Sequence, residues 1–100
     1  MATQKVKRSS GNVFRDLGFA AEDAENLRIR SELMIRLANL IEERDLTQAE
    51  AASMFGVSQP RVSDLVRGKI DLFSIDMLVK MLAKGGLRVT FTARTRRRVA

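Results

Sequence analysis

Apolar positions recur along the chain at two spacings, and each spacing predicts a different secondary structure. From Ala21 to Arg44, large apolar residues return every three or four positions, which is the repeat of one buried helix face. These positions are Leu27, Leu33, Met34, Leu37, Leu40 and Ile41. Acidic residues fill the first turn, where the helix dipole favours them. The segment is therefore predicted to be one long helix with its stripe in the core; a partner-binding stripe is the alternative.

A short helix is predicted to follow the long one. Thr47 with Glu50 three residues on is the signature of a capping box, which opens a helix from about Gln48 to Phe55. Gly56 can adopt the positive φ that ends this helix. The turn after it is therefore predicted to be tight.

A second short helix is predicted directly after this turn, from about Gln59 to Arg67. Ser58 is suited to cap it, and Pro60 lies in its first turn, where a missing backbone donor costs nothing. Gly68 ends it. Two helices of eight or nine residues joined through one glycine are the length pattern of a helix-turn-helix.

Strict alternation appears only near the end of the chain. Ser74 caps a further predicted helix that ends at Gly85 and Gly86, with Ile75, Leu78, Val79 and Leu82 on its buried face. In residues 87–94, Leu87, Val89, Phe91 and Ala93 then alternate with Arg88, Thr90, Thr92 and Arg94. This alternation predicts a half-buried strand, which needs a partner strand. The favoured partner is the same segment of a second copy, so that Leu87, Val89 and Phe91 form a dimer contact; the alternative is the early segment NVFRDLGF, itself a turn or short helix.

The helix-turn-helix interpretation depends on small and apolar residues where the two short helices cross. The inward positions are Ala51, Ala52, Phe55, Val57, Val62 and Leu65. Ala52 lies at the close approach, where a larger side chain would separate the helices. We therefore expect a mainly α fold: a helix-turn-helix bundle of four to five helices with a C-terminal strand. A four-helix bundle that shares the pattern by chance is the alternative.

The outward residues of the second short helix are suited to reading base edges. Gln59 can bond adenine, Arg61 can bond guanine and Asp64 can accept a hydrogen bond from cytosine, each such pair contributing about 1–3 kcal/mol of discrimination. Ser63 completes the expected base-reading set. Because Asp64 would otherwise be repelled by phosphates, we expect it to meet a cytosine or to orient Arg61 or Arg67.

Composition narrows the function further. The 100 residues include no cysteine and no histidine, which leaves no thiolate or imidazole for a metal site or for acid–base catalysis; no enzyme, metal or cofactor is expected. The formal net charge is +6, distributed as +4 over residues 1–15, −5 over 16–79 and +7 over 80–100. Basic ends beside a reading helix favour phosphate contact, with a solubilising role as the alternative. No long apolar run or signal peptide is present, so a cytoplasmic protein, nucleoid-associated when bound to DNA, is expected.

The stretch LTQAEAASMFGVSQPRVSDLVRGK resembles the XRE, or phage-repressor-like, helix-turn-helix family. That resemblance implies a homodimer on a palindromic operator, with half-sites about 34 Å or a multiple apart. It further implies that Gln48 bonds a phosphate and braces Gln59, and that Arg67 and Lys69 approach the DNA backbone. Ser58 is the fourth expected phosphate contact. Pro60 occupies a position that some relatives use to read a base.

The whole chain, from GNVFRDLGF through SIDMLVKMLAKGGLRVTFTAR, is similar to the HigA-type antitoxins of bacterial toxin–antitoxin modules. This resemblance implies a repressor that neutralises a RelE/HigB-like mRNA-cleaving toxin and autorepresses their shared operon. The toxin surface is left open between the segment with Phe14, Leu17 and Phe19 and the face of the long helix with Arg28, Arg30 and Arg36, with the acids Glu22, Asp23, Glu25 and Glu32 as a complementary patch.

Two rival functions remain. A stand-alone phage or mobile-element regulator would share the same reading helix and lack a toxin. An RNA-binding role could rest on the Arg-rich end ARTRRRV, although the five phenylalanines provide few stacking platforms. The expected organisation is a basic tail over 1–12, a DNA-binding domain over 13–86 with its motif at 47–68, a dimerisation strand over 87–94 and a basic tail over 95–100.

Overall fold

The computed structural model describes residues 12–95 and contains five α-helices and one 3-10 helix over this range. The elements are α1 (Val13–Asp16), α2 (Ala21–Glu43), α3 (Gln48–Phe55), α4 (Gln59–Val66), η1 (Ile70–Leu72) and α5 (Ile75–Lys84). The basic residues Lys5, Lys7, Arg8, Arg96, Arg97 and Arg98, which were expected to favour phosphate contact, lie outside the described residues.

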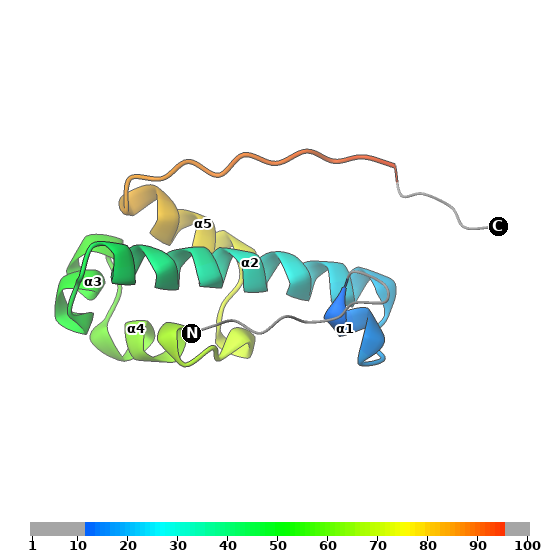
Figure 1. The fold of residues 1–100 in the computed structure, drawn as a ribbon, viewed down its shortest axis with the longest axis horizontal. Coiled ribbons are helices and arrows are strands. Elements are labelled where there is room, and N and C mark those ends of the chain that lie inside the picture. The colour runs from blue at the N-terminus through cyan, green and yellow to red at the C-terminus, as the bar shows by residue number, and fades with distance from the viewer. Residues whose placement is uncertain (1–11, 96–100) are drawn as a thin grey trace.

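Helix α2 forms the centre of the fold (Figure 1). Helix α5 lies on one side of it and α4 on the other, while α3 packs at its C-terminal end and α1 at its N-terminal end. The core gathers the stripe of α2 with the inward residues of α3, α4 and α5, and Leu37, Phe55, Val62, Leu78 and Leu82 are its largest fully buried side chains. The expected stripe on the long helix is thus confirmed as core.

Helix α1 is tied to α2 through its capping residue. The Asn12 carboxamide oxygen accepts hydrogen bonds from the backbone N–H of Phe14 at 2.9 Å and of Arg15 at 3.4 Å, while its Nδ2 donates to the Ala24 carbonyl at 3.3 Å. One side chain therefore both starts the short helix and fixes it against the first turns of α2. Since residues 13–16 are helical, the alternative that this segment pairs with the C-terminal strand does not apply in this structure.

The C-terminal segment does not form a strand within the described chain. After Gly86, residues 87–95 have no regular secondary structure. Leu87 and Val89 pack against the core, whereas Phe91 is 89% exposed. The segment runs on the opposite side of α2 from α4 (Figure 1). The expected strand thus lacks a partner here, because alternation alone cannot supply the hydrogen bonds that hold an extended backbone.

Candidate nucleic-acid interface

Helix α3 begins with a complete capping box. The Thr47 hydroxyl accepts a hydrogen bond from the Glu50 backbone N–H at 3.1 Å, and the Glu50 carboxylate accepts one from the Thr47 backbone N–H at 2.8 Å. Two backbone donors that the helix leaves open are satisfied in this way. The start of α3 is therefore fixed by local chemistry, as the sequence predicted.

The turn between α3 and α4 favours glycine because of its backbone conformation. Gly56 has φ +70°, a region that residues with a Cβ rarely adopt. Among the described residues, the side chain that a Cβ there would crowd is the flexible end of Lys84. The Val57 backbone N–H donates to the Ala52 carbonyl at 3.0 Å and closes the turn. Ala51 and Ala52 are both buried beneath it. The small residues thus let α3 and α4 cross closely.

Helix α4 is held by one cap and two buried residues. The Ser58 hydroxyl accepts a hydrogen bond from the Arg61 backbone N–H at 3.2 Å, and Pro60 lies in the first turn. Val62 is fully buried and Leu65 is 2% exposed, so this face of the helix rests on the core. The rest of its surface carries polar side chains and the partly exposed Val66.

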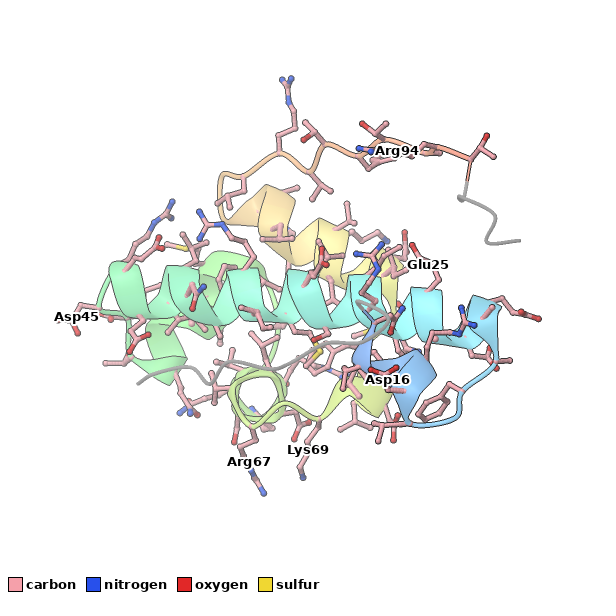
Figure 2. The ribbon with its side chains drawn as sticks, turned by 45° about the vertical axis from the view of Figure 1, so that its right-hand side comes forward. Asp16, Glu25, Asp45, Arg67, Lys69 and Arg94 are labelled. Carbon is pink, nitrogen blue, oxygen red and sulfur yellow. The ribbon has the colours of Figure 1, made fainter. Side chains whose placement is uncertain are left out.

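Five of the eight expected DNA-contacting residues are exposed: one at the start of α3, two at the start of α4 and two just after α4. They are Gln48, Ser58, Gln59, Arg67 and Lys69. Figure 2 shows Arg67 and Lys69 projecting away from the body of the protein just beyond α4. No side-chain hydrogen bond joins Gln48 and Gln59 in the structure of residues 12–95, so the bracing contact implied by the family resemblance is absent from this structure.

Arg61 is directed toward the protein rather than away from it. Its Nη1 donates a hydrogen bond to the Leu72 carbonyl at 2.8 Å, and its guanidinium carbon lies 5.2 Å from the centre of the Phe73 ring. Phe73 is 2% exposed. The expected guanine reader therefore has a structural task in this structure: it ties α4 to the segment that leads into α5.

Ser63 and Asp64 are half-buried on α4. The ionic partner of Asp64 is Lys69, whose Nζ lies 4.0 Å from the Asp64 carboxylate; the sequence had left Asp64 between a contact with cytosine and an ion pair with Arg61 or Arg67. The Lys69 backbone N–H also donates to the Asp64 carbonyl at 3.0 Å. Asp64 thereby orients Lys69, one of the expected phosphate contacts. The sequence did not predict this pair, because the two residues are five positions apart.

Arg30 is a supporting residue that sequence reasoning placed on an outer surface. Its Nη1 donates to the carbonyls of Ile70 at 3.1 Å and Phe73 at 3.2 Å, and its Nε donates to the Asn26 side chain at 2.8 Å. These contacts fix η1, and with it the position of Lys69 directly before it. A partner 40 residues away in the sequence leaves no local pattern, so no sequence signal pointed to this contact.

None of the acidic residues in the described part of the chain gather into a group of three that could hold a metal ion. Within the same residues, no helix is long and apolar enough to cross a membrane.

Helices α3 and α4, joined through Gly56 and packed on α2, define a helix-turn-helix protein. A family model described as "Helix-turn-helix domain" matches residues 13–94, and the chain belongs to this family. A solved structure described as "Putative XRE Family Transcriptional Regulator" is similar, with a TM-score of 0.71 and 32% sequence identity over 78% of this chain and 91% of that one. A comparison with curated proteins finds no match.

Proposed function

We propose that the protein is a sequence-specific, DNA-binding transcriptional regulator of the XRE type that reads its operator with α4. The observation that carries this proposal is the exposed polar surface around α4: Gln59 stands at its first turn, and Arg67 and Lys69 follow its last. Gln59 makes no side-chain hydrogen bond within residues 12–95, so its amide is available to a base edge. The similar solved structure, described as an XRE family transcriptional regulator, supports the same role.

The proposed regulator acts as a homodimer. Residues 88–94 have no regular secondary structure and no backbone hydrogen-bond partner among the described residues, while the Leu87 N–H donates to the Leu82 carbonyl at 2.9 Å; Phe91 is exposed. Pairing of this segment with its copy would satisfy the open backbone groups and cover Phe91. Because the segment lies opposite α4 (Figure 1), such a dimer leaves both reading helices uncovered. Two half-sites would then be read together.

The finer proposal is that this regulator is a repressor and antitoxin that neutralises a RelE/HigB-like toxin and represses their shared operon. Its support is the resemblance of the whole chain to HigA-type antitoxins, including α1 and residues 87–94, which a minimal reading domain does not need. A stand-alone regulator without a toxin is equally compatible with the fold. The two differ in whether a reading frame for a basic RelE-like protein adjoins the gene.

DNA binding is tested with the full-length protein and a fluorescent duplex taken from upstream of its own gene. We expect saturable binding that unlabelled upstream duplex competes away more strongly than a scrambled duplex of equal composition. Gln59→Ala should reduce this preference, whereas the matched control Asn39→Ala, an exposed amide on α2, should keep it. Equal competition by both duplexes would refute sequence-specific binding to this region.

The antitoxin role is tested by co-expression with the product of the adjacent reading frame. We expect growth arrest by that product alone, rescue of growth on co-expression, and a complex that survives gel filtration. An adjacent product that arrests growth in the presence of the regulator, or that forms no complex, would contradict the antitoxin proposal and leave the stand-alone regulator.

A further inference from the structure

A groove with apolar and acidic walls lies between α1, the first turns of α2 and η1. It has a volume of about 450 Å³ and is lined mainly by Phe14 and Phe19 from the α1 region, Glu22 and Asp23 from α2, and Ile70 and Asp71 from η1. We refer to it as the α1–η1 groove. Three separate stretches of the chain meet there, so no single segment of the sequence encodes it.

Its aromatic wall is only partly covered by the protein. The Phe14 and Phe19 rings meet edge to face with centroids 6.3 Å apart and an angle of 71° between their planes. Phe19 nevertheless remains 46% exposed, and Leu17, two residues earlier in the chain, is 70% exposed. Exposed large apolar side chains on a small domain are a recurrent feature of docking sites.

Its acidic wall is not neutralised by the neighbouring arginines. Arg28 bonds Glu25 at 2.6 Å and Glu32 at 2.7 Å, which lie outside the groove. Arg30 lines the groove, but its guanidinium is engaged by backbone carbonyls and by Asn26. The carboxylates of Glu22, Asp23 and Asp71 have no hydrogen-bond or ionic partner in the described range 12–95. Three carboxylates that have no partner within residues 12–95 therefore border the aromatic wall.

We propose that the α1–η1 groove docks an arginine side chain, flanked by an apolar residue, from a partner protein. A guanidinium is planar: it can lie against the exposed Phe19 face while its N–H groups reach the carboxylates in bidentate pairs. The flanking apolar residue would cover Leu17. DNA does not fit the groove, because its phosphates would be repelled by the same carboxylates. This docking site goes beyond the DNA-reading role and does not require the partner to be a toxin.

The location of the groove places its occupant beside the DNA-reading surface. Ile70 lines the groove and directly follows Lys69, the expected phosphate contact. A protein docked there would adjoin the end of α4 without covering Gln59 at its start.

The test starts with random twelve-residue peptides displayed on phage and selected against the full-length protein. We expect the enriched peptides to carry arginine beside a large apolar residue. One of them, labelled with a fluorophore, is then titrated with the wild type, with the E22Q/D23N/D71N variant and with a matched control, E42Q/E43Q/D45N, which removes the same number of charges from the other end of α2.

The groove variant should bind the peptide at least about tenfold more weakly, since each partly exposed charge pair contributes modestly and the variant removes three carboxylates. The control should bind as the wild type does, and changing the arginine of the peptide to lysine should weaken binding to the wild type. The Phe19→Leu variant, which keeps an apolar wall, should reduce the preference for arginine over lysine. Circular dichroism confirms that each variant is folded.

Three outcomes of the peptide experiments would overturn the proposal. These are no enrichment over the unselected library, enriched peptides without arginine, and equal binding by the groove variant and the control. A deletion of residues 1–11 that strengthens peptide binding about tenfold or more would also overturn it, because the groove would then serve the basic start of this chain rather than a partner protein.

Discussion

Replacing Arg61 with alanine should destabilise the protein, because its guanidinium is engaged inside the fold. The change removes a hydrogen bond of 2.8 Å from a charged donor to the Leu72 carbonyl and the contact with the Phe73 ring at 5.2 Å. Hydrogen bonds that involve a charged group contribute about 1.5–3 kcal/mol, and partly exposed cation–π contacts about 0.5–1 kcal/mol. Since Arg61 is half-buried, we expect a loss of about 2 kcal/mol.

The loss is measured by urea unfolding and by thermal melting followed by circular dichroism. For a domain of this size, about 2 kcal/mol corresponds to a fall in Tm of roughly 10 °C. Gln59→Ala, on the same helix and exposed, is the matched control and should change the free energy of unfolding by less than about 0.5 kcal/mol. If Arg61→Ala were no more destabilising than Gln59→Ala, the structural role of Arg61 would be refuted.

The contacts of Arg61 within the protein also limit its use as a base-reading residue. To reach a guanine, Arg61 would have to break intramolecular contacts that contribute about 2 kcal/mol to stability. A bidentate contact with the base contributes about 1–3 kcal/mol of discrimination. Because these two free energies are similar, Arg61 is expected to add little to the choice of site. Gln59 gives up no intramolecular contact within the described residues, so we expect it to contribute more than Arg61 to the choice of DNA site.

Three further changes test the helix ends and the dimer. Gly56→Ala should cost about 1–2 kcal/mol in urea unfolding, because φ is +70° there; an unchanged midpoint would show that this conformation is not required. Thr47→Ala should cost about 1 kcal/mol by removing half of the capping box, and Thr47→Ser, which keeps the hydroxyl, should restore most of it. Phe91→Asp should convert the dimer into a monomer, as measured by light scattering. Arg88→Asp, which changes a residue on the other face of the segment, should keep a larger fraction of the protein dimeric. A monomeric wild type would refute the strand pairing.

The helices were predictable from the sequence because their ends are set by local chemistry. Helix α3 occupies the predicted Gln48–Phe55, and α4 ends at Val66, one residue before the prediction. Thr47, Ser58 and Ser74 each cap the helix they were expected to cap. The buried positions followed equally directly, since the spacing of apolar residues determines which helix face can leave water.

The contacts around η1 could not be predicted. Arg30 and Arg61 both donate hydrogen bonds to carbonyls of the Ile70–Phe73 stretch, and these partners are 40 and 11 residues away in the sequence for the closest pairs. An arginine on a polar helix face looks the same in sequence whether it faces solvent, DNA or a distant carbonyl. The partner of residues 87–94 is equally absent from the sequence pattern, because alternation predicts an extended segment but not the strand beside it.

The central claim, that α4 reads DNA, is tested most directly by selecting binding sites from random duplex DNA with the full-length protein and sequencing them. We predict one enriched palindrome with half-sites about 10 base pairs, or a multiple, apart. Gln59→Ala should weaken enrichment at particular positions of that site, while Arg67→Ala should lower affinity for all sequences and flatten the salt dependence by about 0.9 for each phosphate that is no longer neutralised. A wild-type protein that enriches no motif, or a Gln59→Ala variant that enriches the same motif equally strongly, would contradict the claim.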